Sequence, residues 1–236
     1  MTDDFREPAH ARTLAAALAI CGLATLTLLA NHPGGGAQSF AEVLKAEARD
    51  QAIAGIVHGG FIGTLAALIV CFVLLCRYLG QYRLPVVIGF VAFCIGSGAM
   101  MASLIVDGFV VPAVAVRFSA VGASDNLASA RTILVLCGTL IRFLMPMAMA
   151  FQGIALVGIS SCLLRRRGAA RAAGIYGLLV GILLSGAVFA APPGMAEHVL
   201  LIGIVLQALW YLAIAAAVFR ESRDGDAASN RFAPYT

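Results

Sequence analysis

Hydrophobic residues run through this chain in long stretches separated by short polar segments. Five clear stretches cover residues 13–30, 52–76, 85–106, 172–190 and 199–219. Each is close to the 20 or so apolar residues that a helix needs to cross a bilayer. A sixth, residues 132–164, is too long for one crossing, so counting back about 20 to 22 residues from Arg165 predicts a span at 143–164. Residues 126–141 would then form a separate helix outside the hydrocarbon.

This pattern predicts an all-α, polytopic membrane bundle of six transmembrane helices, and the composition agrees. Of 236 residues, 61% are hydrophobic and 12% are charged, and the mean hydropathy is +0.95. A soluble domain carries about a quarter charged residues, so a soluble or disordered protein is excluded. The basic residues are dispersed, which argues against nucleic acid as a partner. The six cysteines contain no CxxC and are expected to be packing residues.

Basic residues alternate in number from one end of the predicted spans to the other. The richer ends hold Arg6, Arg12, Arg77, Arg83, Arg165, Arg166, Arg167, Arg171, Arg220, Arg223 and Arg231. The opposite ends hold Lys45, Arg49, Arg117, Arg131 and Arg142, on longer loops. The positive-inside rule therefore predicts that both termini are cytoplasmic, in the inner (plasma) membrane. The first stretch is expected to be an uncleaved helix, since it lacks a small-residue cleavage site.

We expect one six-helix domain over residues 1–220 and a disordered cytoplasmic tail over residues 221–236. In the first outer loop, Ser39 and Glu42 form a capping-box pattern. It predicts a short amphipathic helix over residues 40–50 at the outer interface, or alternatively a solvated extension of the second span.

Small residues recur at spacing four in three of the spans. These ridges comprise Gly55, Gly59 and Gly63, then Ala92 and Gly96 with Gly98 and Ala102, and finally Gly177, Gly181 and Ser185. Small residues let helix backbones approach closely in lipid. The ridges predict close packing, either within the bundle or against a membrane-protein partner.

Five polar residues share one depth within the predicted spans. They are Thr64, Ser97, Gln152, Ser185 and Gln207, each 13 or 14 residues from a cytoplasmic arginine. At 1.5 Å per residue this is about 20 Å. Interhelical hydrogen bonds are expected here, whereas a translocation path would need an ionisable group at this depth.

The same count brings four ionisable residues to the outer boundary. His58 lies at about 28 Å, Asp107 at about 36 Å, Arg142 at about 35 Å and His198 at about 33 Å. We expect them to form a ligand pocket, with His32 on a loop at the same level. Asp107 and Arg142 are expected to form an ion pair, and His58 and His198 to face a common cavity.

This set of side chains suits several chemistries. His58 and His198 could ligate haem b axially. His58, His198 and Asp107, with His32, could instead hold a divalent metal with an open water position, which would permit hydrolysis. Without a metal, the pocket could bind an anionic head group or a quinone. The sequence has no HExxH, no GxSxG after a strand and no Walker loop to decide between them.

Three classes of function remain open. The first is an inner-membrane binding or transport component whose outer pocket holds haem or a divalent metal. The second is a structural accessory subunit of a larger membrane complex. The third is a metal-dependent membrane hydrolase, so whether the chain is an enzyme stays open. The first and third classes need His58 and His198 to face one another inside the bundle, whereas the second needs an exposed ridge of small residues.

Overall fold

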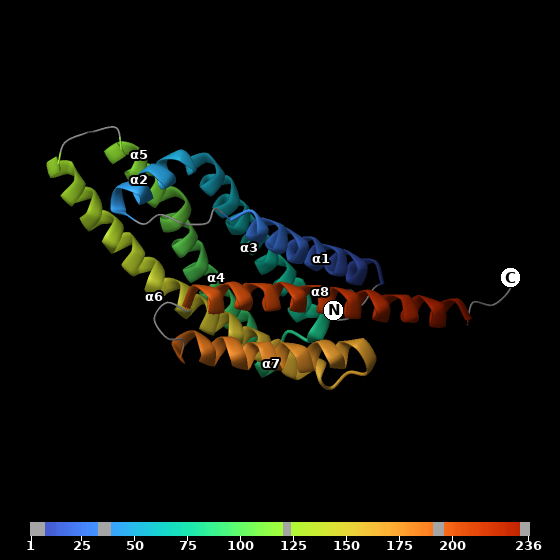
Figure 1. Ribbon diagram of the computed structural model, residues 1–236. Coiled ribbons are helices and arrows are strands. Elements are labelled where there is room, and N and C mark those ends of the chain that lie inside the picture. Colours follow the sequence, from blue (N-terminus) through green and yellow to red (C-terminus); the bar gives the residue numbers. More distant parts are fainter. Residues whose placement is uncertain (1–7, 33–38, 120–123, 191–195, 232–236) are drawn as a thin grey trace.

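The structure is a computed structural model that describes residues 8–32, 39–119, 124–190 and 196–231. Every element in these ranges is a helix (Figure 1). In chain order the elements are α1 (Pro8–Ala30), α2 (Phe40–Arg49), α3 (Gln51–Leu79), α4 (Leu84–Ile105), the π-helical turn η2 (Val106–Val110), α5 (Val111–Ser119), α6 (Ser124–Leu163), α7 (Gly168–Ala190) and α8 (Ala196–Arg231). Six helices within the described ranges are long and apolar enough to cross a membrane, which confirms the predicted class.

Helix α6 differs from the prediction of two separate pieces. It runs unbroken from Ser124 to Leu163, with Pro146 inside it. The expected break between residues 126–141 and 143–164 was wrong, because one continuous helix satisfies the backbone hydrogen bonds within itself. At 40 residues, α6 is about 60 Å long, roughly twice the thickness of the hydrocarbon.

Two further helices continue past their predicted ends. The third span does not stop at residue 106, because α4 passes through η2 into α5 and ends at Ser119. Helix α8 reaches Arg231, so residues 221–231 are helical where a disordered tail was expected. Residues 232–236 of that expected tail lie outside the described residues.

The short helix predicted between the first two spans is present in the structure. The Ser39 hydroxyl accepts a hydrogen bond from the Glu42 backbone N–H, and the Ser39 N–H donates to the Glu42 carboxylate. This reciprocal capping box starts α2 at Phe40. Helix α2 then packs against α5, at the end of the bundle opposite the start of α1 and the end of α8 (Figure 1).

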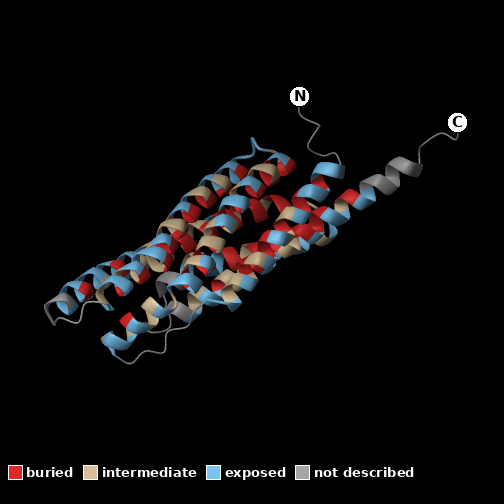
Figure 2. Ribbon diagram, turned by 90° about the horizontal axis from the view of Figure 1, so that it is seen from above, coloured by how far each residue is buried: buried red, intermediate tan, exposed pale blue. Residues whose placement is uncertain are grey.

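The six long helices close into a ring. Helix α1 packs against α3 and α8, and the ring continues through α7, α6 and α4 back to α3. The start of α1 and the end of α8 lie at the same end of the bundle (Figure 1). Buried residues line the inner faces of the helices, and exposed residues cover the outer faces (Figure 2).

Aromatic side chains fill the centre of the ring. Phe72 of α3 stacks on Phe93 of α4, with ring centroids 3.6 Å apart. Trp210 and Tyr211 of α8 each lie 6.2 Å from Phe72. Because lipid tails are as apolar as these side chains, the cluster stabilises the bundle through close packing rather than through burial from water.

The predicted layer of polar residues forms fewer bonds between helices than expected. Thr64 and Gln207 donate to groups on their own helices. Ser185 donates to a carbonyl of α6 at 3.4 Å, as well as to one of its own helix. Ser97 Oγ and Gln152 Nε2 are buried without a hydrogen-bond partner among the described residues.

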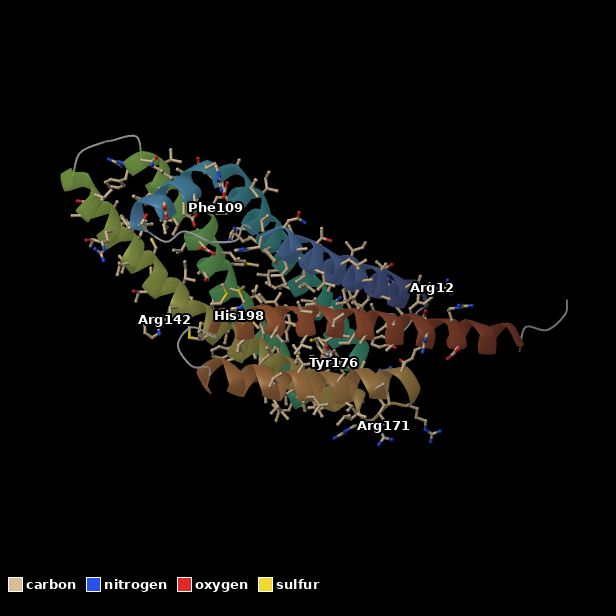
Figure 3. The ribbon with its side chains drawn as sticks, in the orientation of Figure 1. Arg12, Phe109, Arg142, Arg171, Tyr176 and His198 are labelled. Atoms are coloured by element: carbon tan, nitrogen blue, oxygen red, sulfur yellow. The ribbon has the colours of Figure 1, made fainter. Side chains whose placement is uncertain are left out.

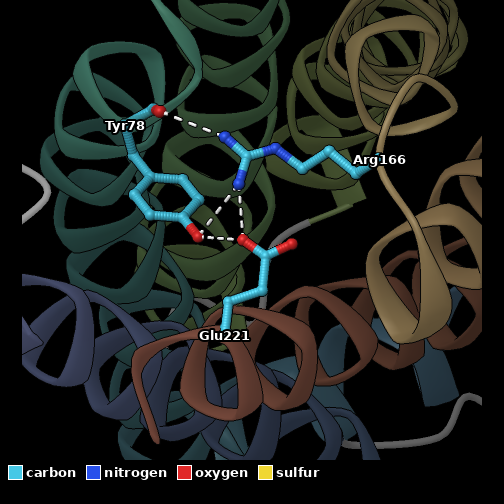
Figure 4. A network of polar contacts seen from close by, with 3 residues as sticks. All are labelled: Tyr78, Arg166 and Glu221. Atoms are coloured by element: carbon cyan, nitrogen blue, oxygen red, sulfur yellow. Dashed lines mark hydrogen bonds and ion pairs between the residues drawn. The ribbon is translucent and has the colours of Figure 1, made fainter. Parts of the chain in front are cut away.

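A polar network that the sequence did not reveal joins three elements at the arginine-rich end (Figure 4). Arg166, in the connection from α6 to α7, donates to the Glu221 carboxylate of α8 and to the Tyr78 hydroxyl of α3, the latter at 3.2 Å. The Tyr78 hydroxyl donates to the same carboxylate. The guanidinium also lies 4.7 Å from the centroid of the Tyr78 ring.

The small-residue ridges pack closely at Gly96 of α4 and at Gly177 and Gly181 of α7, but not at Gly98 of α4 or in α3. A Cβ at Gly96 would lie 2.8 Å from a carbonyl oxygen of α6, and one at Gly181 would lie 2.7 Å from another. In α3 the close contact is at Gly60, where a Cβ would lie 2.7 Å from Leu28 of α1. Gly63, in the predicted ridge, has nothing within 4 Å.

Gly177→Ala should destabilise the protein. The added Cβ would overlap Trp210 Nε1 and Ser160 Oγ, and both residues are fully buried. We expect a loss of about 1–3 kcal/mol in the free energy of unfolding, the usual range for overpacking. Thermal unfolding in detergent measures it. Gly186→Ala, on the same helix with open space around it, is the control, and equal midpoints for the two variants would contradict the packing.

Candidate metal centre

His58 lies two turns into α3 and is 2% exposed. Its Nδ1 is 2.8 Å from the carbonyl oxygen of Ala54. A carbonyl oxygen only accepts hydrogen bonds, so Nδ1 must carry the hydrogen. In the neutral imidazole, Nε2 then has a free lone pair. The helix backbone therefore fixes the tautomer and directs the lone pair away from α3.

Asp107 meets that lone pair. Its Oδ2 is 3.1 Å from His58 Nε2, and its side chain is about one-third exposed. Asp107 lies in η2, the π-helical turn that packs against α3. Single π turns inside α-helices occur frequently at functional sites. Here the turn brings a carboxylate to a buried imidazole.

Gly108 permits this approach. A Cβ at position 108 would overlap Cβ and Cγ of His58, so any side chain there would push η2 away from α3. The sequence analysis missed this residue. The available signal was a glycine directly after the one acidic residue of a long apolar helix.

His32 joins the group from a third segment. It follows the end of α1, and its ring centroid is 5.0 Å from that of His58. The close contact between Gly60 and Leu28 brings this end of α1 beside α3. Each of His32, His58 and Asp107 offers one ligand atom, and these three atoms all lie within 4.8 Å of one another. Two imidazoles and a carboxylate therefore converge from three segments far apart in the chain.

Glu47, which the sequence analysis did not select, adds a second carboxylate close to this group. It is partly buried on α2. Burial, followed by the negative charges of Asp107 and Asp50, raises the pKa of Glu47. The end of the bundle that holds η2 thus gathers negative charge that a cation would neutralise.

Arg142 and His198 do not belong to this group. Both are exposed, on α6 and at the start of α8, and Figure 3 shows both well apart from Phe109, which lies in η2 beside Asp107. Among the described residues the ion pair of Asp107 is with His58, so the expected pair with Arg142 is not formed. Depth along a helix sets the height of a residue but not the side of the bundle that it faces.

The geometry suits a small cation. His58 Nε2 and Asp107 Oδ2 are both acceptors, yet they are only 3.1 Å apart. A proton between them would form an imidazolium–carboxylate pair, and a metal ion would bind both. Ligand atoms about 2.0–2.1 Å from a tetrahedral zinc ion lie about 3.3 Å apart, close to the separation here. Nitrogen and oxygen donors of this kind also bind manganese and iron.

A groove of about 440 Å³ borders the site between α3 and η2. It is lined by Gln51, Ala52, Gly55, Ile56, Gly108 and Phe109. Gly108 belongs to both features, since it packs on His58 and also lines the groove. The groove therefore shares Gly108 with the packing around His58, but none of the three candidate ligands lines it.

No known family model matches the chain, and neither the curated proteins nor the solved structures contain a significant match. The fold and the site together define a multi-span membrane helix bundle with a His/His/Asp group that could hold a metal. What this centre does is therefore argued from its geometry.

A double-mutant cycle tests the contact between His58 and Asp107. Without metal, we expect His58→Gln and Asp107→Asn to be coupled by about 0.5–3 kcal/mol in the free energy of unfolding, the range typical of contacting residues. Arg142→Gln and Asp107→Asn should be additive. Coupling to Arg142 with additivity at His58 would contradict this geometry.

Glu47→Gln tests the charge at the site. The folded-state pKa of Glu47 is raised. Ionisation of Glu47 therefore lowers the free energy of unfolding as the pH rises from about 4.3, the unfolded-state pKa, through the folded-state pKa. The variant removes this loss. We expect it to be more stable than the wild type at pH 8 in chelator, with the difference disappearing near pH 4. A variant less stable at pH 8 would rule out the unfavourable charge.

Proposed function

We propose that this protein is an inner-membrane metal-binding protein that holds a divalent transition-metal ion at its extracytoplasmic face through His32, His58 and Asp107. The observation that carries the proposal is the orientation of buried His58. Its Nδ1 is committed to the Ala54 carbonyl, and its Nε2 lone pair faces the Asp107 carboxylate. Metal-binding histidines characteristically donate the other ring N–H to a backbone carbonyl or a carboxylate in this way.

The positive-inside rule supports this orientation of the site in the membrane. Arg12 and Arg171 lie at the end of the bundle away from η2 (Figure 3), as does the Arg166 network. Because arginine-rich ends are retained in the cytoplasm, the His/His/Asp group would face the outside. It would then be loaded from the periplasmic or external side.

The donor positions favour a single ion over haem. The Asp107 carboxylate lies 3.1 Å from His58 Nε2, in the space where the iron and macrocycle of an axially ligated haem would lie. His198, the other axial candidate, is exposed. A three-ligand centre also leaves a coordination position open, as catalytic and ligand-binding zinc sites do.

Binding is favoured over ion transport through the bundle. A path would have to continue from the site into the polar layer, but Thr64 and Gln207 donate within their own helices. An ionisable group would also be expected along a transport path. Metal-dependent hydrolysis is the second candidate, because a three-ligand centre leaves a position for a water molecule.

Metal titration of the purified full-length protein tests the proposal. We expect one equivalent of Co²⁺ or Zn²⁺ to bind, with at least about a hundredfold loss of affinity in His58→Ala, because losing a ligand should exceed the 10–100-fold cost of losing a second-shell partner. Asp107→Asn should also weaken binding. Isothermal titration calorimetry and the visible spectrum of bound Co²⁺ measure these effects.

His198→Ala is the matched control, since it removes an exposed imidazole outside the group. Its metal affinity should equal that of the wild type. Stoichiometric binding that survives His58→Ala but is lost in His198→Ala would place the metal elsewhere and end the proposal.

A further inference from the structure

Helix α6 is the least covered of the six candidate spans, and its first half continues past the helix that packs beside it. In its most apolar stretch 17% of the residues are buried, against 33–39% in the other five spans. The Ser185 hydroxyl of α7 donates to the Ala150 carbonyl of α6, and α7 ends five residues later at Ala190. Because a short connection makes the two helices antiparallel, α7 stops near the level of Met147 in α6.

The first half of α6 extends beyond the hydrocarbon of the bilayer. The helix has 40 residues and is about 60 Å long, whereas the hydrocarbon core is about 30 Å thick. Counting about 20 residues back from Arg165, at the arginine-rich end, puts the far boundary near residue 145, which is also where α7 stops. Ile133 is 14 residues before Met147, about 21 Å further along the helix. Apolar side chains exposed there meet water unless protein covers them.

Five large apolar side chains line one face of this part of α6. They recur at alternating intervals of three and four residues, which is the spacing of the a and d positions of a coiled coil. All five are exposed, and together they form what we call the apolar seam: Ile133 (37%), Leu136 (60%), Leu140 (44%), Phe143 (73%) and Met147 (43%).

A second exposed face of the same segment carries positive charge. Its residues, also one helical turn apart, are Leu127, Arg131, Val135, Gly138 and Arg142. Two copies in contact through this face would bring arginines of like charge together, which opposes association. The apolar seam contains no charged residue, so it is the exposed face through which α6 can meet a second α6.

The orientation of copies in a membrane makes the seam complementary to itself. Copies inserted in the same direction and related by a two-fold axis along the membrane normal present the same surface to one another, with their α6 helices parallel. In a parallel coiled coil each a or d residue packs beside the same residue of the partner helix. Leu136 would meet Leu136 of the second copy, and Phe143 would meet Phe143.

We propose that the apolar seam of α6 joins two copies of this protein as a parallel homodimer. The contact begins at Met147, near the edge of the hydrocarbon, and extends to Ile133. Within the bilayer, lipid tails are as apolar as these side chains and give the helices no hydrophobic reason to associate. Beyond the hydrocarbon, removal of the seam from water drives the association. The inference is independent of the proposed metal centre.

Val135 and Leu136 offer a matched pair of positions for cross-linking. They are adjacent and equally exposed, at 61% and 60%, but only Leu136 belongs to the seam. In native membranes oxidised with copper phenanthroline, we expect Leu136→Cys to form a disulfide-linked dimer. Val135→Cys should stay at the background of the wild type, which contains six cysteines of its own.

Charge substitutions at the same two positions test the contact with the purified full-length protein. Leu136→Glu would place two carboxylates opposite each other in the dimer, whereas Val135→Glu adds the same charge outside the seam. We expect the dissociation constant of the dimer to rise at least about tenfold in Leu136→Glu, because like charges at an interface oppose association. Val135→Glu should match the wild type. Light scattering after size-exclusion chromatography in dodecyl maltoside measures the mass of the protein at several concentrations.

Three results would overturn the inference. A seam covered by lipid alone would leave Leu136→Cys at background in the membrane. A different protein on the seam would give a cross-linked product of another mass. Equal cross-linking at positions 135 and 136 would show that the contact is not specific to the seam. These variants leave His32, His58 and Asp107 unchanged, so metal titration of the same proteins shows whether the metal centre stands when the dimer does not.

Discussion

The hydrogen bond from His58 Nδ1 to the Ala54 carbonyl decides which ring nitrogen is available to the rest of the site. With that nitrogen occupied, only Nε2 can bind a proton or a metal. Asp107 lies opposite it because η2 packs directly against α3, and the missing side chain of Gly108 makes that contact possible. The candidate chemistry of this site therefore depends on one intrahelical hydrogen bond and one close approach between helices.

The two ends of the bundle use charge differently. At the arginine-rich end, Arg166, Tyr78 and Glu221 satisfy one another and join α3 and α8 to the connection between α6 and α7. At the end that holds η2, the Nε2 of neutral His58 and the Asp107 carboxylate are both acceptors, and Glu47 adds further negative charge. The first arrangement is complete as it stands, whereas the second needs either a proton or a metal ion between His58 and Asp107.

The bilayer explains where the helices follow simple rules and where they depart from them. Backbone groups in lipid must be satisfied within the helix, so α6 stays continuous through Pro146 and α4 continues through η2 into α5. Close packing replaces the hydrophobic effect between helices, which is why Gly96 and Gly181 contact carbonyl oxygens of neighbouring backbones.

Hydrophobic runs determined the six candidate spans, the capping pattern determined the start of α2, and the rise per residue predicted that His58 and Asp107 lie at a similar height. These properties depend on local spacing along one helix, so they can be read without neighbours. Other features depended on how each helix is rotated and which helix lies beside it. Asp107 pairs with His58 rather than with Arg142. His32 and Glu47 lie at the site, and His198 does not. Only the packing of the ring decides those, because the angular position of a side chain matters as much as its depth.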